Sequence, residues 1–373
     1  MKKLILPISI LFFLLTIGCQ EETNRTTYPN PNPNPGDGNS GGDGNNNQNS
    51  EWLIPEGEVR DGGPGKDGIP SIDSPRFAKA STIMDLATND LVLGIVDSNG
   101  NKKAYPHNIL DWHEIVNDKN GEGFVSVIYC PLTGTGTLWN RSLNGGVTTF
   151  GVSGLLYNSN IIPYDRNSNS NWSQMLLKSV NGSLRGTDSR NFKIIETRWG
   201  TWRSMFPDSD VLTRETGYSR NYDFYPYGNY KTNHSYLLFP VSNRDSRMQN
   251  KERVLGIVID GEAYAYSFNN FKTQTNVIQN THNGQSLVIC GNEANNFIVA
   301  YKSHVEGGEE LTFTAVQDAL PVIMIDNEGT TWDIFGRGVS GPQAGAELEM
   351  IDSFMGYWFA WAAFYPSLTL DGN

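Results

Sequence analysis

The stretch VIYCPLTGTG, residues 127–136, ends an apolar run in a cysteine and then makes a turn. Cys130 is followed by Pro131, Thr133, Gly134 and Gly136. Such a turn lets the backbone approach a ligand closely and presents N–H groups that would stabilise a thiolate. Cys130 also fits a plainer role as a small buried side chain at the end of a strand. The sequence leaves both roles open.

Two histidines are the candidate partners of this thiol. His113 follows Ile109 by four residues and Leu110 by three, which places it on the inward stripe of a helix, as a core residue or a ligand. If the strand of Cys130 runs back along that helix, His107 comes nearer to the sulfur, whereas an oblique crossing favours His113. We therefore predict a catalytic pair of Cys130 and His113, and a copper or zinc site of Cys130, His113 and His107.

Other motifs do not support known chemistries. The segment GVSG at 151–154 lacks the last glycine of a nucleophile elbow. The calcium-like stretch 165–176 has Ser170 at the glycine position and Leu176 at the glutamate position, so we expect a turn capped by Asp165 instead. A disulfide between Cys130 and Cys290 remains a structural alternative.

The chain contains an internal duplication. VLGIVDSNGNKKAYPHN at 92 corresponds to VLGIVIDGEAYAYSFNN at 254, and SVIYC at 126 to SLVIC at 286. We predict two tandem units of about 120 residues, packed with pseudo-twofold symmetry. The first is 51–212 with its N-terminal extension and the second is 254–373, joined by a tyrosine-rich connector, 213–253. Only the first unit has the special turn and His113, since Lys272 replaces the histidine in the second.

Short alternating strands dominate both units. We expect strands at 91–96, 124–130, 135–142, 147–153 and 161–167. A helix capped by Asn108 is expected over HNILDWHEIVND, and a second around 197–207. Trp172 and Trp332 occupy matching places and are predicted packing anchors. The fold class is therefore α+β with mainly antiparallel β structure.

The N-terminus resembles a bacterial lipoprotein signal that ends at Cys19. We predict a signal peptide at 1–18 and a disordered Pro/Gly/Asn tether at 19–50, with Cys19 carrying a diacylglyceryl anchor whose two acyl chains, such as palmitate, hold the protein on the membrane. QEETN resembles the surface-export tag of Bacteroidetes lipoproteins. The expected location is the outer membrane, on its periplasmic or cell-surface face. The mature chain would carry a net charge of about −14, which disfavours nucleic-acid partners.

Six ordered motifs carry a family resemblance: GGPGKDGIPSIDSPRF, AYPHNILDWHEIVND, YCPLTGTG, FGVSGLLYNSN, GYSRNYDFYPYGNY and WFAWAAFYP. Together they resemble the family catalogued as domain of unknown function 3179. The resemblance implies no established activity. Many relatives look like CPLCG at the cysteine turn, where this chain has Thr133, so dithiol chemistry is not expected here.

We therefore hold two hypotheses for function. In the first, the Cys/His site binds a soft metal or performs single-thiol redox chemistry. In the second, the protein is a non-enzymatic surface module that binds a glycan or a protein through the aromatic segment 218–236, and its cysteines are purely structural.

Overall fold

Short antiparallel sheets make up most of the computed structural model, which describes residues 51–97, 99–121 and 123–371. The expected signal peptide, the tether and Cys19 lie outside these residues. Within the described part of the chain, no helix is long and apolar enough to span a membrane. The predicted α+β class with mainly antiparallel pairing is confirmed.

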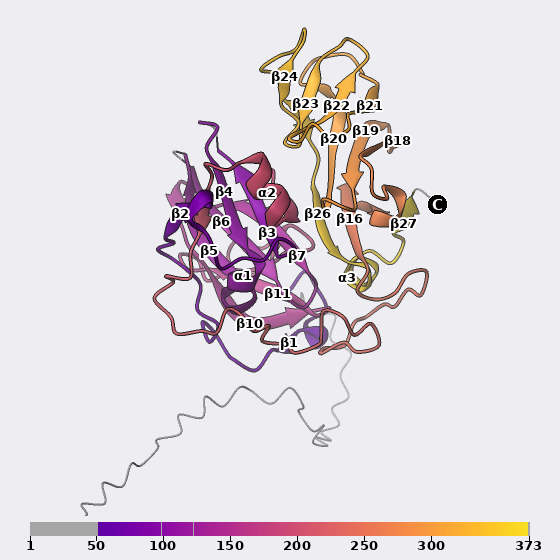
Figure 1. The fold of residues 1–373 in the computed structure, drawn as a ribbon. Helices are drawn as coiled ribbons and strands as arrows, with labels where there is room; N and C mark the ends of the chain where they lie inside the picture. The colour runs from indigo at the N-terminus through magenta and orange to yellow at the C-terminus, as the bar shows by residue number, and fades with distance from the viewer. Residues whose placement is uncertain (1–50, 98, 122, 372–373) are drawn as a thin grey trace, which may run out of the picture. The chain divides into compact units, whose positions relative to one another are not determined.

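Residues 51–212 form three principal sheets and a small hairpin (Figure 1). The first sheet has the order β14-β3-β4-β15-β2, the second β5-β6-β7 and the third β1-β10-β11-β12-β13. Their strands are β14 (Ile195–Arg198), β3 (Leu91–Val96), β4 (Lys102–Pro106), β15 (Asp210–Leu212), β2 (Phe77–Lys79), β5 (Ile115–Asn120), β6 (Gly123–Cys130), β7 (Thr135–Asn140), β1 (Arg60–Asp61), β10 (Phe150–Tyr157), β11 (Asn160–Asp165), β12 (Asn171–Ser173) and β13 (Lys178–Asn181). The hairpin is β8 (Ser142–Leu143) and β9 (Gly146–Val147).

Residues 253–371 form three sheets with a similar order of elements (Figure 1). These sheets are β26-β16-β17-β27, β18-β19-β20-β25 and β21-β22-β23-β24. Their strands are β26 (Ser353–Tyr357), β16 (Arg253–Ile259), β17 (Glu262–Ser267), β27 (Thr369–Asp371), β18 (Asn276–His282), β19 (Gln285–Asn292), β20 (Phe297–Val305), β25 (Leu348–Met350), β21 (Phe313–Ala315), β22 (Val322–Asp326), β23 (Thr331–Asp333) and β24 (Gly338–Ser340).

One parallel pairing occurs at the same place in each set. Strand β15 pairs in parallel with β4, and β27 pairs in parallel with β17. In each case a helix precedes the parallel strand: α2 (Trp199–Met205) in the first set and α3 (Trp358–Phe364) in the second. The pseudo-twofold packing of two copies stays a prediction.

The first helix is shorter than the sequence predicts. Helix α1 spans His107–His113 and begins after Pro106, so Asn108 is not its N-cap. Glu114 follows with φ +59°, which ends the helix. The residues IVND that were expected to extend the helix form β5 instead. The β-branched Ile115 and Val116 favour this strand, in which Ile115 pairs with Ile128 of β6.

The predicted tryptophan anchors are fully buried in both sets of sheets. The indole N–H of Trp172 donates to Asp165 Oδ2 at 3.1 Å, and that of Trp332 donates to Asp326 Oδ2 at 2.9 Å. Asp165 Oδ1 also accepts the Ser168 N–H at 2.7 Å, which confirms the turn expected in place of a calcium loop.

In each set of sheets, a tryptophan of the helix packs against a glycine of the neighbouring strand, β3 or β16. A Cβ added to Gly94 would lie 2.0 Å from the Trp202 ring, and one added to Gly256 would lie 2.2 Å from the Trp361 ring. These glycines therefore provide the room that lets α2 and α3 pack directly on β3 and β16.

We expect Gly94→Ala to lower the free energy of unfolding by about 1–3 kcal/mol, because the new methyl group overpacks the Trp202 contact. Urea denaturation followed by tryptophan fluorescence measures the change. Gly57→Ala is the control, since a Cβ there meets no atom within 4 Å. Equal stability of the two variants would contradict the packing argument.

Candidate functional site

Cys130 is the last residue of β6 and lies under the turn that leads into β7. The residue is 1% exposed, and its S–H group donates to the Ser159 carbonyl at 3.7 Å. Gly134 has φ +61°, and a Cβ there would lie 3.0 Å from the Tyr357 ring. The Tyr357 N–H donates to Thr133 O at 2.7 Å, so the segment that precedes α3 holds this turn in place.

The carboxyl group beside Cys130 belongs to Glu114, a residue that the sequence analysis did not select. Glu114 O accepts the Tyr129 N–H at 2.7 Å, which sets Glu114 alongside the end of β6. The side chain lies within the protein, since the residue is 6% exposed. Its backbone has φ 59° and ψ −35°, a strained conformation for a residue other than glycine. Strain of this kind is frequent at functional sites.

Burial controls the protonation of both groups. It raises the pKa of Glu114 to about 8, while a hydrogen bond from Tyr227 lowers that pKa and the charge of Asp111 raises it. Burial and then the charge of Glu114 raise the pKa of Cys130 to about 11. At neutral pH the site therefore holds a neutral thiol beside a carboxyl group that is mostly protonated.

The tyrosine-rich connector covers this pair. The Tyr230 hydroxyl donates to Leu132 O at 3.1 Å, and the Tyr225 hydroxyl donates to Pro131 O at 3.4 Å. Tyr227 hydrogen bonds to Glu114, as described above. Lys231 Nζ lies 2.8 Å from Asp111 Oδ2 on α1. Tyr225, Tyr227 and Tyr230 of the connector thus contact Glu114 and the turn after Cys130, and do not extend into the solvent.

Lys251 secures the connector itself. Its ammonium group donates to the carbonyls of Tyr230, Asn233 and Tyr236 at 2.6, 2.7 and 2.6 Å, and lies 3.4 Å from the centroid of the Tyr230 ring. Lys251 is buried. Three hydrogen bonds from one cation therefore fix the loop that bears Tyr230 and Lys231.

His113 is buried as predicted, but its ring nitrogens have other partners than Cys130. Nδ1 lies 2.8 Å from Pro70 O, and Nε2 lies 2.7 Å from the Tyr222 hydroxyl. Burial lowers the pKa of His113 to about 4. The geometry thus assigns His113 to the core, between the segment that precedes β2 and the connector.

His107 is the first residue of α1, and its ring contacts the end of β6. Its ring centroid is 4.5 Å from that of Tyr129, the residue before Cys130. Its Nε2 lies 3.4 Å from Glu196 Oε2, and Glu196 forms an ion pair with Arg253. Burial, followed by the charges of Lys231 and Arg253, holds the pKa of His107 well below its usual value. This imidazole is therefore neutral at neutral pH.

Cys290 provides the comparison within the same molecule. It is buried in β19, and its S–H group donates to Ile323 O at 3.8 Å. Burial alone raises the pKa of its thiol, whereas Cys130 also has a carboxyl neighbour. Both cysteines are free thiols, so the disulfide alternative is not formed. Among the described residues, no cluster of three or more His, Cys, Asp or Glu side chains is arranged to hold a metal ion.

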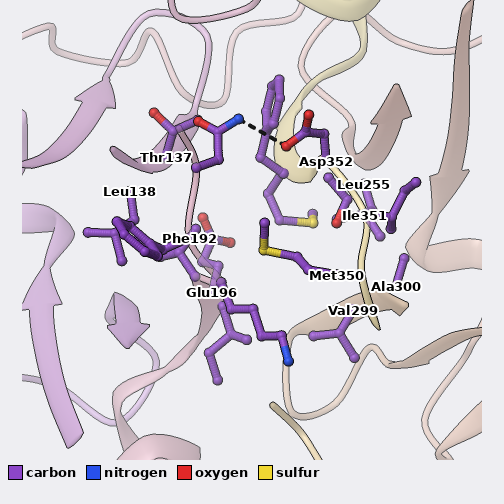
Figure 2. Close-up of a pocket in the computed structure, with 18 of the residues that line it drawn as sticks. Thr137, Leu138, Phe192, Glu196, Leu255, Val299, Ala300, Met350, Ile351 and Asp352 are labelled. Atoms are coloured by element: carbon purple, nitrogen blue, oxygen red, sulfur yellow. Dashed lines mark hydrogen bonds between the residues drawn. The ribbon is translucent and has the colours of Figure 1, made fainter. Parts of the chain in front are cut away.

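A cleft of about 50 Å³ lies between strands of the two sets of sheets, and Cys130 is not among its lining residues. Figure 2 shows Glu196, Leu138 and Phe192 on one side, with Leu255 and Ile351 on the other. Its volume suits a few water molecules. The cleft nevertheless reaches Glu196, which joins the charged groups around His107.

Comparison with known proteins gives one match. No curated protein and no solved structure is significantly similar to this chain. The family described as "Protein of unknown function (DUF3179)" matches residues 66–368, which is most of the chain and includes every side chain of the site described above. The chain therefore belongs to the DUF3179 family.

Proposed function

We propose that the protein is a lipid-anchored extracytoplasmic thiol protein, in which Cys130 exchanges with small-molecule disulfides. The asymmetry between the two cysteines carries the proposal. Both are buried, but only Cys130 has a carboxyl group beside it, a glycine turn after it and a connector over it. The difference between the two units supports a chemical role for Cys130 that Cys290 does not share.

The exchange is balanced by one proton. The sulfur of Cys130 bonds to one sulfur of the disulfide R–S–S–R, the S–S bond breaks, and the products are Cys130–S–S–R and R–SH. The proton lost by Cys130 is matched by the proton gained by the leaving sulfur. Glu114 is suited to relay it, because a carboxyl group with a pKa of about 8 both gives and takes a proton near neutral pH.

The connector must open for the exchange to occur. A thiol that is 1% exposed, with a pKa of about 11, is a weak nucleophile while it is covered. Between the cover and the site, the contacts described above are hydrogen bonds from tyrosine hydroxyls and the ion pair of Lys231 with Asp111, while Lys251 holds the connector loop itself. Such contacts reform easily, so reactivity would depend on local opening of the connector.

Soft-metal binding at Cys130 stays a prediction. Neither predicted imidazole is directed at the sulfur: His113 bonds to Pro70 and Tyr222, and His107 lies beside Glu196. The geometry therefore favours thiol exchange over a copper or zinc site with these ligands. Elemental analysis of untagged protein, with Cys130→Ala as the comparison, decides between the two.

A second candidate is the surface binding module. Tyr218, Phe224 and Tyr236 of the connector are exposed, and such aromatic side chains provide contact area for a glycan or a protein. Binding of that kind does not need the thiol. It would persist in Cys130→Ser, a variant that abolishes the exchange reaction.

We also infer that the two sets of sheets descend from one duplicated unit with pseudo-twofold packing. The matching parallel pairings, the two Gly–Trp contacts and the two Asp–Trp hydrogen bonds support this inference. In this view the first copy kept the chemical groups, while the second supports the cysteine turn through Tyr357.

Incubation with 2-hydroxyethyl disulfide should give one mixed disulfide per chain, at Cys130. Peptide mass spectrometry after acid quenching locates the adduct. Cys130→Ser should give none, and Cys290→Ser should react like the wild-type protein. An adduct that forms on Cys290 as fast as on Cys130, or no adduct at all, would remove the thiol proposal.

The contribution of Glu114 to the free energy of unfolding should fall as pH rises from 6.5 to 8. Its pKa is about 8 in the folded protein against an ordinary 4.5, so the folded state holds a proton that the unfolded state has lost. One such group contributes a slope of at most about 1.4 kcal/mol per pH unit. The raised pKa of Asp111, about 6, lies below this window, but the ordinary histidine value of 6.5 lies at its lower edge and the lowered pKa of Lys251, about 8, at its upper edge. The contribution of Glu114 is therefore the difference in slope between the wild-type protein and Glu114→Gln.

Urea denaturation at several pH values measures this slope. Glu114→Gln should flatten it, because glutamine keeps the shape of the side chain without a titratable proton. Glu310→Gln is the control, since Glu310 is exposed. A slope unchanged in Glu114→Gln would show that the carboxyl group does not titrate as proposed.

Cys19 should carry the lipid anchor. Labelled palmitate fed to a bacterial host should enter the full-length protein, which should sediment with membranes. Cys19→Ala should take up no label and should leave the membrane fraction, because two acyl chains on one residue provide the anchoring. Label retained by Cys19→Ala would contradict the proposed attachment.

A further inference from the structure

A group of buried and partly buried charges lies within electrostatic range of Glu114, through Asp111. It contains two carboxylates and two cations: Asp111 of α1, Glu196 of β14, Lys231 of the connector and Arg253 of β16. Lys231 pairs with Asp111 at 2.8 Å, and Arg253 pairs with Glu196. The thiol reaction described above uses these charges only indirectly, through the Lys231–Asp111 pair that holds the connector and through the effect of Asp111 on the pKa of Glu114.

Four buried atoms in this group have no hydrogen bond: Asp111 Oδ1, Glu196 Oε2, Arg253 Nε and Arg253 Nη2. Glu196 Oε2 still faces His107 Nε2 at 3.4 Å, and Arg253 Nη2 is ion-paired with Glu196, which leaves Asp111 Oδ1 and Arg253 Nε without any partner. Asp111 Oδ1 is an acceptor without a donor, and Arg253 Nε is a donor without an acceptor. Both atoms are buried, and the Asp111 side chain is 5% exposed. Buried polar atoms are nearly always satisfied, because an unsatisfied one costs about 1–3 kcal/mol. The protein thus has one spare acceptor on an anion and one spare donor on a cation.

Two tyrosines connect these spare atoms to Cys130. Tyr129 precedes Cys130 in β6, and Tyr357 donates its N–H to Thr133 in the cysteine turn. Each tyrosine lies within electrostatic range of both Asp111 and Arg253, and Tyr357 is also within range of Cys130. The charged group therefore shares the tyrosines that flank the cysteine turn, and Lys231 links it to the same connector.

We propose that the disulfide that exchanges with Cys130 is a small one with amino-acid head groups, whose ammonium binds Asp111 and whose carboxylate binds Arg253. This inference rests on the proposed thiol exchange and names its substrate class. The reaction is the one balanced above, with cystine as R–S–S–R and cysteine as R–SH.

The charge balance excludes simpler head groups. A ligand with only a carboxylate would satisfy Arg253 Nε and leave Asp111 Oδ1 buried without a donor. A ligand with only an ammonium group would leave the arginine unsatisfied instead. A zwitterion satisfies both and adds no net charge to a site where unpaired charge is costly.

Four disulfides test the inference: cystine, cystamine with ammonium groups only, 3,3′-dithiodipropionate with carboxylates only, and uncharged 2-hydroxyethyl disulfide. The measurement is the initial rate of adduct formation at Cys130 in the full-length protein. Cystine should react about tenfold faster than each of the others, which is the effect of one additional charge-assisted hydrogen bond. Equal rates for all four would overturn the inference and leave the thiol exchange standing, whereas no adduct with any of them would overturn both.

Two single substitutions test whether these side chains recognise the head groups of the disulfide or only stabilise the fold. Asp111→Asn should lower the cystine rate to that of dithiodipropionate, with both rates taken relative to the uncharged disulfide in the same variant, because loss of the Lys231 pair also loosens the connector. Arg253→Lys keeps the cation but removes Nε, and should bring cystine to the rate of cystamine. A uniform change across all four disulfides would show a structural role only and would overturn the inference.

Discussion

The position of Glu114 is the constraint on which the site depends. This residue ends α1 with a positive φ, and its carbonyl accepts a hydrogen bond from the Tyr129 N–H. The same backbone conformation therefore ends the helix, leads into β5 and places a carboxyl group near Cys130. Because that group is buried, it stays mostly protonated at neutral pH. A charged carboxylate there would repel a thiolate, whereas a neutral acid supplies a proton.

The second set of sheets acts on the site as a support. Tyr357 holds the cysteine turn through Thr133 O, and its ring closes over Gly134. Arg253 enters the charged group by pairing with Glu196 of the first set. The first set of sheets thus carries the thiol, and the second carries side chains that complete its surroundings.

The fold could be predicted from the sequence further than the site. The alternation of apolar and polar residues, together with the turn residues, predicted β3, β6 and β11 to within two residues at each end. The tryptophans repeated in both units were correctly predicted to be buried packing anchors. The end of α1 was missed because Glu114 has the positive φ that usually indicates glycine. That error lengthened the helix, and the expected distances from Cys130 to His107 and His113 depended on its length. The carboxyl partner was missed for the same reason.

The tyrosine-rich connector was predicted from the sequence, but its composition could not show whether its tyrosines face the solvent or the interior of the protein. A tyrosine ring is apolar and its hydroxyl is polar, so a tyrosine-rich segment suits both an exposed binding surface and a buried cover. Hydrogen bonds decide the case here. Tyr225 and Tyr230 reach carbonyls of the turn that follows Cys130, and Lys251 gathers three connector carbonyls around one ammonium. The segment therefore covers the thiol, and the proposed exchange would depend on the stability of that cover.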